Sequence, residues 1–318
     1  MNVLITGGFG YLGGRLAQFF ASQSDYKVFL GSRQHRESPT WLPKVNVVQM
    51  VWDSKEELTH ACKEMDVIVH LAGMNSQNSI LDPVSAFKVN SELTEKLLTS
   101  SIKNGVKRFI YLSTAHVYGS PLEGTITEET YPTNTHPYAS SHRSGEDVIR
   151  AAHQRDEIKG IVIRLSNAYG APMHKEVNCW MLLVNDLCLQ AIKGRQLLLH
   201  SSGLQLRDFI TLNDTVRAIE YFIRCPVSKL GDGLFNLGGN KSSRVIDFAK
   251  DIAERCYITN GYRPTIQHSK ETNPFDISRP LDYRIDKLLR TGFKLKGNVN
   301  DEIDATLRFC QNHFKVKN

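Results

Sequence analysis

A glycine-rich segment close to the start of the chain limits most strongly how this sequence can fold. Glycines stand at positions 7, 10 and 13, between the apolar run Val3-Leu4-Ile5 and a segment with helical apolar spacing, 12–20. Glycines at this spacing allow a tight turn after a strand, close approach of backbone amides to a pyrophosphate, and close contact between helix and sheet. Unpaired N–H groups at the start of the helix favour a bound phosphate. The context favours a dinucleotide-binding turn over a plain turn, with contacts from Gly7, Phe9, Gly10, Tyr11, Leu12 and Gly13.

Short apolar strands alternate with helical segments through the first half of the chain. The strand candidates that follow the first are Val28-Phe29-Leu30, Val45-Asn46-Val47-Val48, Val67-Ile68-Val69, Phe109-Ile110-Tyr111-Leu112 and Ile161-Val162-Ile163. The helix candidates between them include 86–102 and 138–152. Continuous Val- and Ile-rich strands separated by helices predict a parallel sheet covered on both faces. The fold class is therefore α/β, a Rossmann-type doubly wound sheet.

The alternation loosens after about residue 170. Helices are predicted over 178–192 and 214–223, and strands over 207–210 and 234–237. We therefore divide the chain into a dinucleotide-binding domain, 1–170, and a smaller substrate-binding region, 171–318, with some later segments returning to the first domain.

Composition excludes several classes of protein. The chain has 318 residues, 41% of them hydrophobic, and a formal net charge of +6. That apolar fraction supports a well-buried core and argues against disorder. The basic residues are scattered, and the densest cluster, 33–36, is too short for a nucleic-acid footprint. We expect no nucleic-acid partner.

The cellular location is predicted from what the sequence lacks. No apolar run approaches the ~18–20 residues that cross a bilayer, so membrane insertion is not expected. The N-terminus shows neither the basic region nor the cleavage site of a secretory signal. The cysteines are widely spaced and form no C-x-x-C pair, which is typical of free thiols rather than disulfides or a metal site. We expect a cytoplasmic protein without a metal. The cysteines are Cys62, Cys179, Cys188, Cys225, Cys256 and Cys310.

The choice of dinucleotide is read at the end of the second strand. An Asp or Glu there normally binds the ribose 2′-hydroxyl of NAD. The segment 30–36 contains no carboxylate, but it contains Ser32, Arg33 and Arg36. A 2′-phosphate is accommodated well by such a segment, which favours NADP over NAD, although a solvated basic loop is the alternative. Asp53 is placed either to bind the adenine amine or to cap a helix that starts near Ser54.

Several further motifs establish a resemblance along nearly the whole chain. Together with the glycine-rich turn, they are similar to those of the extended short-chain dehydrogenase/reductases, the NAD-dependent epimerase/dehydratase family. This group contains nucleotide-sugar epimerases, dehydratases and 4-ketoreductases. The motifs are His70-Leu71-Ala72-Gly73, Ser113-Thr114-Ala115-His116-Val117-Tyr118-Gly119, Pro137-Tyr138, Arg164-Leu165-Ser166-Asn167-Ala168-Tyr169-Gly170, Arg207-Asp208-Phe209-Ile210 and Phe235-Asn236-Leu237-Gly238-Gly239.

The resemblance implies hydride transfer between C4 of a hexopyranose and a nicotinamide. Tyr138 is the implied general base or acid, and Thr114 binds the same sugar oxygen. A phenol with a pKa near 10 needs nearby positive charge for this role. The resemblance also implies that Leu71, Ala72 and Gly73 contact the cofactor.

The chain departs from the family where a lysine is expected four residues after the tyrosine. His142 occupies that position. Residues i and i+4 share a helix face, so His142 still points toward the cofactor ribose. Imidazole is mostly neutral at pH 7 and lowers the tyrosine pKa less than an ammonium. Two hypotheses stay open, a working but retuned site and a binding-only site.

A second departure concerns the two residues after Thr114. Dehydratases of the family carry Asp-Glu there, whereas this chain has Ala115 and His116. Dehydration is therefore not expected. His116 is either an ionisable group near the sugar or a polar residue beside the strand end.

The resemblance also identifies residues for the diphosphate of the nucleotide sugar. Asn167 and Arg207 match positions that hold it, and Arg279 resembles a C-terminal arginine that binds the same group. A guanidinium suits a diphosphate because it donates in a bidentate fork. The alternative for Arg207 is a structural ion pair with Asp208 or Asp214.

The leading prediction is an NAD(P)-dependent nucleoside-diphosphate-sugar epimerase that acts through a transient 4-keto sugar. The alternatives are an NADPH-dependent nucleotide-sugar 4-ketoreductase and a non-catalytic nucleotide-sugar or NADP sensor. The resemblance adds a role in polysaccharide biosynthesis and a homodimer formed through the tyrosine helix and its neighbour. The apolar spacing of Val89, Leu93, Leu97 and Val148 gives a hint of that interface.

Overall fold

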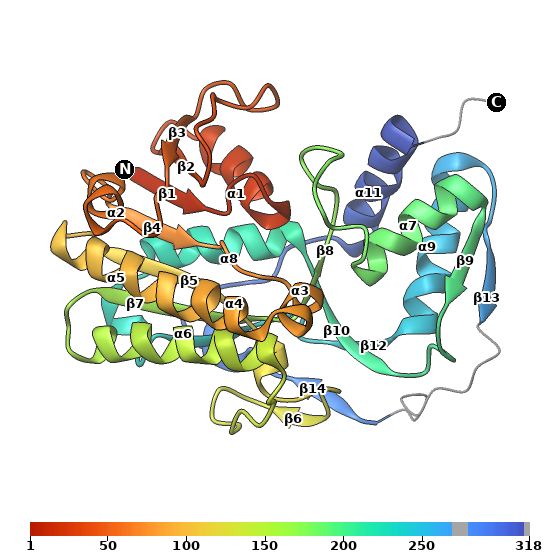
Figure 1. Cartoon of the computed structure of the whole chain (residues 1–318). Helices are drawn as coiled ribbons and strands as arrows, with labels where there is room; N and C mark the ends of the chain where they lie inside the picture. The colour runs from red at the N-terminus through yellow and green to blue at the C-terminus, as the bar shows by residue number, and fades with distance from the viewer. Residues whose placement is uncertain (269–278, 315–318) are drawn as a thin grey trace.

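A computed structural model describes residues 1–268 and 279–314 and shows two lobes joined through β8 and β10 (Figure 1). The larger lobe is built on a seven-stranded sheet in the order β11-β7-β5-β4-β1-β2-β3, and every neighbouring pair in it is parallel. The strands are β1 (Asn2–Thr6), β2 (Lys27–Ser32), β3 (Asn46–Gln49), β4 (Val67–His70), β5 (Arg108–Thr114), β7 (Lys159–Leu165) and β11 (Leu234–Leu237). The doubly wound α/β prediction is confirmed.

Alternation along β1 shows how the sheet is covered on both faces. Val3 and Ile5 belong to one core, and Leu4 belongs to another on the opposite face. Successive side chains of a strand point to opposite faces, so a continuous apolar run requires helices on both sides. The first core is closed by α1 (Tyr11–Ala21) and α8 (Leu212–Arg224), and the second by α2 (Lys55–Ala61), α5 (Leu93–Lys103) and α6 (Pro137–Gln154).

The smaller lobe has a core of its own. Side chains of α7 (Leu183–Gly194), α9 (Val245–Asn260) and α11 (Val299–Phe314) meet there with β9 (Gln196–Leu199), which pairs with β13 (Thr265–His268). Three strands, β8 (Asn167–Tyr169), β10 (Leu206–Thr211) and β12 (Ser242–Arg244), form the connection between the lobes. The remaining elements are α3 (Ser76–Leu81), α4 (Pro83–Phe87), β6 (Gly124–Ile126), β14 (Leu281–Tyr283) and α10 (Asp286–Arg290).

The helix predicted over 86–102 is interrupted. Helix α4 is followed by a π-helical turn, Lys88–Glu92, before α5 begins at Leu93. The extra residue of this turn brings Asn90 inside, where its Oδ1 accepts from the Met74 backbone N–H at 2.7 Å and its Nδ2 donates to the Ser141 hydroxyl at 3.0 Å. Such π turns are frequent at functional sites. Here it ties the loop after β4 to the tyrosine helix.

Two other predictions need correction. The helix predicted from residue 178 starts at Leu183, because the preceding residues form turns that face a cavity. Of the four residues suggested for a dimer face, Leu93 and Leu97 are buried inside this chain. The exposed apolar side chains nearby are Ile80, Leu81, Val84 and Phe87. Across residues 1–268 and 279–314, no helix combines the length and apolarity of a membrane span.

Candidate active site

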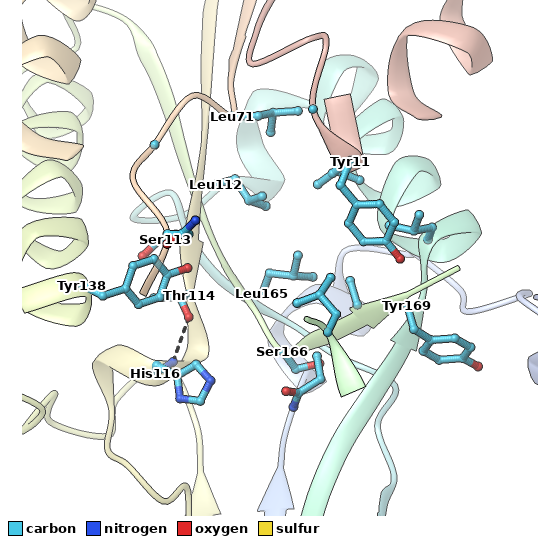
Figure 2. Close-up of a pocket in the computed structure, with 18 of the residues that line it drawn as sticks. Tyr11, Leu71, Leu112, Ser113, Thr114, His116, Tyr138, Leu165, Ser166 and Tyr169 are labelled. Carbon is cyan, nitrogen blue, oxygen red and sulfur yellow. Dashed lines mark hydrogen bonds between the residues drawn. The ribbon is translucent and has the colours of Figure 1, made fainter. Parts of the chain in front are cut away.

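A cavity of about 480 Å³ is lined by residues of both lobes, at the carboxyl ends of β1, β4 and β5. The strand order reverses at β1, which pairs with β2 on one side and with β4 on the other. Ligands of doubly wound sheets bind at this kind of switch point. Figure 2 shows Tyr138 and Thr114 on one side of the cavity and Tyr11 on the other, with Leu71, Leu112 and Leu165 between them.

The glycine-rich turn leaves no room for a side chain at Gly7 or Gly13. A Cβ on Gly13 would lie 2.2 Å from the Gly7 carbonyl oxygen, and one on Gly7 would lie 2.9 Å from the Ala72 nitrogen. Gly7 also has a φ of +69°, a conformation that favours glycine. Gly10 caps α1 without a side-chain bond, so the first N–H groups of the helix face the cavity. The turn therefore forms an anion-binding backbone cradle.

We expect Gly13→Ala to abolish this cradle. The added methyl would overlap a backbone carbonyl, which cannot move without opening the turn. Dinucleotide affinity should fall at least tenfold, about 1.4 kcal/mol, as measured by calorimetry. Gly194→Ala is the matched control, because its Cβ meets side-chain atoms no closer than 3.5 Å. Unchanged affinity in Gly13→Ala would show that the turn does not hold the ligand.

The cofactor residues predicted from sequence lie in two groups. Gly7, Gly10, Tyr11, Leu12, Gly13, Leu71 and Gly73 line the cavity, whereas Phe9, Ser32, Arg33, Asp53 and Ala72 do not. Ser32 is buried at the end of β2, and its hydroxyl donates to the Gln34 carbonyl at 2.7 Å. Arg33 is exposed, and no described residue bonds to its guanidinium.

The capping role considered for Asp53 is wrong. Ser54 is the N-cap of α2, and its hydroxyl oxygen accepts from the Glu57 N–H. The Asp53 carboxylate is exposed and lies 3.4 Å from the Lys88 ammonium. Its contact with adenine stays a prediction.

Tyr138 stands near the start of α6, where Pro137 fixes the first turn. Its ring lies beside Thr114 at the carboxyl end of β5 (Figure 2). Burial raises the pKa of the Tyr138 hydroxyl, and the Thr114 side chain opposes that rise. Among the described residues, no cation opposes the effect of burial on this pKa.

His142 follows one helical turn later and is itself buried. The centroids of its ring and the Tyr138 ring are 4.7 Å apart in an edge-to-face arrangement. Its Nδ1 lies 2.8 Å from the Tyr111 hydroxyl oxygen. Burial lowers the pKa of His142 to about 4, so the imidazole is neutral at physiological pH. His142 therefore lines the cavity as a neutral hydrogen-bonding group, without the charge of a lysine.

This depressed pKa predicts how stability depends on pH. The unfolded chain protonates His142 near pH 6.5 and the folded chain only near pH 4, so the unfolded state binds one more proton between those values. Stability is fully present above pH 6.5 and falls as the pH decreases through 4. We expect His142→Gln to flatten the stability curve in that window by about 1.4 kcal/mol per pH unit. Chemical denaturation at several pH values measures this difference, and parallel curves would contradict it.

Three of the predicted substrate residues lie where the first cavity meets a second one. His116, Asn167 and Arg207 line it, and they also line a second cavity of about 690 Å³ that continues below. Burial and the nearby Arg207 guanidinium lower the pKa of His116. The Asn167 side chain donates to the Asp208 carbonyl at 2.9 Å.

Arg207 does not form either of the ion pairs considered for it. Asp208 points the other way, where its carboxylate accepts from the Ser166 hydroxyl at 2.5 Å and the Gly239 N–H at 2.8 Å. Asp214 pairs with Arg217 at 2.6 Å. No described residue bonds to the Arg207 guanidinium, which leaves its donors available to an anion in the cavities.

Arg279 lies apart from these residues. It lines the second cavity only and forms an exposed ion pair with Glu123. Binding of a diphosphate by Arg279 would replace this ion pair, so its predicted role differs from that of Arg207.

A buried ion pair that begins on the tyrosine helix was missed by sequence reasoning. The Glu146 carboxylate of α6 accepts from Arg164 Nη2 at 2.6 Å and, through both of its oxygens, from Arg164 Nε at 3.1 Å. It also accepts from the Ser113 hydroxyl. Both charged side chains are at most 3% exposed. Glu146 lies two turns after Tyr138 on the same buried helix face, so an acidic residue on an apolar face was the available signal.

An aromatic group at the edge of the glycine-rich turn was also missed. His174 Nε2 donates to the Phe9 carbonyl at 3.2 Å, and the His174 ring stacks on Trp41 with centroids 5.4 Å apart. Trp41 meets the Phe9 ring edge to face at 6.5 Å. We call Phe9, Trp41 and His174 the aromatic clasp, because they connect the β2–β3 loop and the β8–α7 loop across the turn.

The fold and the backbone cradle define the class of protein, a dinucleotide-binding α/β protein with a second cavity next to the cradle. Comparison with known families then identifies the chain. The model of the NAD dependent epimerase/dehydratase family matches residues 3–238, and the chain belongs to this family.

Individual relatives are distant but extend over the whole chain. The dTDP-D-glucose 4,6-dehydratase of Mus musculus is 25% identical, over 98% of this chain and 89% of that protein. A UDP-glucose 4-epimerase of Thermus thermophilus, solved with NAD, has a TM-score of 0.81 at 22% identity, covering 98% of this chain and all of that one. A UDP-glucuronic acid 4-epimerase of Bacillus cereus, solved with UDP-glucuronic acid and NAD, has a TM-score of 0.80 at 20% identity, covering 99% and 100%.

Proposed function

We propose that this chain is an NAD(P)-dependent nucleoside-diphosphate-sugar epimerase that acts through a transient 4-keto sugar. The main support for this proposal is that the backbone cradle, Tyr138, Thr114 and Arg207 all line one cavity, and that of these only Arg207 also lines the second cavity. This order matches a ligand sequence of dinucleotide, sugar and diphosphate. The family and the epimerases and dehydratases among its relatives support the same class of substrate.

The residues present fit the cofactor. A Cβ on Gly7 would overlap the backbone of Leu71 and Ala72, and one on Gly13 would overlap the backbone of Gly7, so the turn closes this tightly only with glycine at both positions, as a pyrophosphate-binding turn requires. Gly7, Gly10, Leu12 and Gly13 would hold the pyrophosphate, and His142 would meet a ribose hydroxyl. A nicotinamide bound there would supply reversible hydride transfer at C4 of the sugar.

The chain's own groups perform the proton transfer. Tyr138 Oη takes the proton from the C4 hydroxyl and later returns one to the ketone, with Thr114 Oγ1 orienting the same oxygen. Burial raises the pKa of Tyr138, and His142 stands where a lysine would lower it. Arg207 would bind the diphosphate, which leaves the sugar free to turn while its nucleotide stays fixed.

Dehydration is not supported by the residues that follow Thr114. Ala115 is buried and carries no acid, and His116 is an imidazole whose pKa is lowered. The acid–base pair that the resemblance assigns to dehydratases is therefore missing, although dehydratases are among the curated relatives.

The aromatic clasp supports an epimerase over a reductase with exchangeable cofactor. An epimerase regenerates its dinucleotide in every cycle and gains from holding it tightly. The clasp lies at the edge of the glycine-rich turn and joins the β2–β3 loop to the β8–α7 loop. The purified protein should therefore carry a dinucleotide that chromatography identifies after denaturation. An empty protein that binds and releases NADPH would instead favour the 4-ketoreductase.

The clasp gives a direct prediction for cofactor retention. We expect Trp41→Ala to raise the dissociation rate of the dinucleotide about tenfold or more, since it removes the stacking surface of His174. Stopped-flow fluorescence with a competing dinucleotide measures this rate. Trp180→Ala is the control, because Trp180 stacks on Phe309 in the smaller lobe. Equal rates in all three proteins would show that the clasp does not retain the cofactor.

The preferred dinucleotide is proposed to be NADP. The Arg33 guanidinium, which follows β2 and has no partner among the described residues, supports NADP, whereas the related solved structures contain NAD. Identification of the dinucleotide released on denaturation decides between the two.

The chain is also proposed to form a homodimer. The exposed side chains Ile80, Leu81, Val84 and Phe87 support it, and the molar mass in solution tests it.

A further inference from the structure

His142 is held from behind by a buried tyrosine of the central sheet. Tyr111 lies on β5, is 1% exposed, and has its hydroxyl oxygen 2.8 Å from His142 Nδ1. The same hydroxyl donates to the Asn90 backbone carbonyl at 3.1 Å. Asn90 is the buried residue of the π turn between α4 and α5. The His142 imidazole is therefore connected to this turn through the Tyr111 hydroxyl.

Only one arrangement of protons makes both contacts of Tyr111 hydrogen bonds. A phenol has a single proton, and a carbonyl oxygen only accepts. If Tyr111 donated to His142, its oxygen would face the Asn90 oxygen at 3.1 Å without a proton between them. If it donates to Asn90 instead, His142 donates from Nδ1–H to the phenol oxygen. The Asn90 carbonyl also accepts from the Thr94 hydroxyl at 3.0 Å, so the choice rests on the 3.1 Å contact between the Tyr111 and Asn90 oxygens, which only the second arrangement bridges with a proton.

The surrounding groups leave no other proton source for this imidazole. His70, whose ring stacks on Tyr111, has its own nitrogens bonded to Thr6 at 2.6 Å and Thr94 at 2.9 Å. The Asn90 side-chain amide is bonded to Met74 and Ser141, so it is not directed at His142. The described residues provide no partner for His142 Nε2, and His142 lines the cavity.

We propose that Tyr111 is a positioning residue that fixes His142 in the Nδ1–H tautomer, so that Nε2 presents a hydrogen-bond acceptor to a ribose hydroxyl of the dinucleotide. The contact with the ribose rests on the proposed function, whereas the tautomer does not. A lysine at this position would present a charged donor, whereas His142 presents a neutral acceptor. The site therefore binds the ribose with the opposite hydrogen-bond polarity.

The tautomer is measured directly by nitrogen NMR of protein labelled at its histidines, with His142→Gln identifying the His142 signals. We expect a protonated Nδ1 and an unprotonated Nε2 at pH 7 before any ligand is added. We also expect the Nε2 signal to move when NAD or NADP is added. An Nε2–H tautomer in the wild type would overturn the proposal, even if Tyr111 variants do not fold.

Substitution of Tyr111 distinguishes a role in positioning His142 from a general role in stabilising the fold. Tyr111→Phe should produce a mixture of His142 tautomers and weaken binding of NAD or NADP about tenfold. Tyr283→Phe is the matched control, because it removes another buried hydroxyl, which donates to the Arg164 carbonyl at 2.7 Å. We expect it to leave the His142 signals unchanged. An unchanged tautomer or unchanged affinity in Tyr111→Phe would overturn the proposal. If the wild-type protein binds neither NAD nor NADP, the proposed function is refuted, whereas the tautomer assignment stands.

Discussion

Replacing Tyr138 with phenylalanine is expected to lower turnover about 10²–10⁴-fold, the usual contribution of a positioned acid or base. The substitution removes the hydroxyl next to Thr114 and leaves the ring that meets His142. Dinucleotide and nucleotide-sugar affinities should therefore change little. Steady-state rates together with calorimetric binding constants measure the two effects separately.

The same variant distinguishes an enzyme from a sensor. Tyr257→Phe is the matched control, because Tyr257 is exposed in the smaller lobe, and we expect wild-type turnover from it. Wild-type turnover in Tyr138→Phe would mean that another group transfers the proton. If the cellular phenotype survived while turnover was lost, the binding-only hypothesis would gain support.

Removing one charge of the buried Glu146–Arg164 pair has the largest expected effect on stability. Glu146→Gln leaves the Arg164 guanidinium, 3% exposed, without a counterion. Breaking such a pair from one side costs about 3–5 kcal/mol, since the remaining charge is buried and uncompensated. Arg164 also stacks on Tyr118, with the guanidinium carbon 4.6 Å from the ring centroid, so β7 and the segment after β5 should loosen together. Denaturant titration measures the loss.

An exposed ion pair supplies the comparison. Glu157 bonds to Arg155 at the end of α6, where both side chains are open to solvent. Glu157→Gln should change the free energy of unfolding by less than about 1 kcal/mol, as is usual for surface pairs. A similar small change in Glu146→Gln would show that the buried pair is not important for stability.

The central sheet is predictable from sequence because its determinants are local. Runs such as Val67-Ile68-Val69 are apolar at every position, which only a strand buried on both faces requires. Glycine spacing likewise located the cradle, and the helix period placed His142 beside Tyr138. These features depend on neighbours in the sequence or on one helical turn.

The features that the sequence did not reveal depend on contacts between distant segments. Trp41 and His174 lie in irregular loops that have no periodic pattern to relate them. The Tyr111–His142 bond joins a strand and a helix, and it depends on a π turn that the apolar spacing of 86–102 concealed. The buried ion pair of Glu146 could have been predicted, since an acid on the buried face of a predicted helix requires a partner.

The fate of the hydrogen at C4 distinguishes internal hydride return, as in an epimerase, from net reduction by an exchangeable cofactor. UDP- and dTDP-hexoses deuterated at C4 are incubated with the purified protein, without added cofactor, and the products are examined by NMR and mass spectrometry. We expect a C4 epimer that keeps its deuterium at C4, even when excess unlabelled NADPH is added. Deuterium that appears in soluble dinucleotide, or a product that forms only with added NADPH, would contradict internal hydride return. Absence of any product from a protein that also carries no dinucleotide would contradict the epimerase itself.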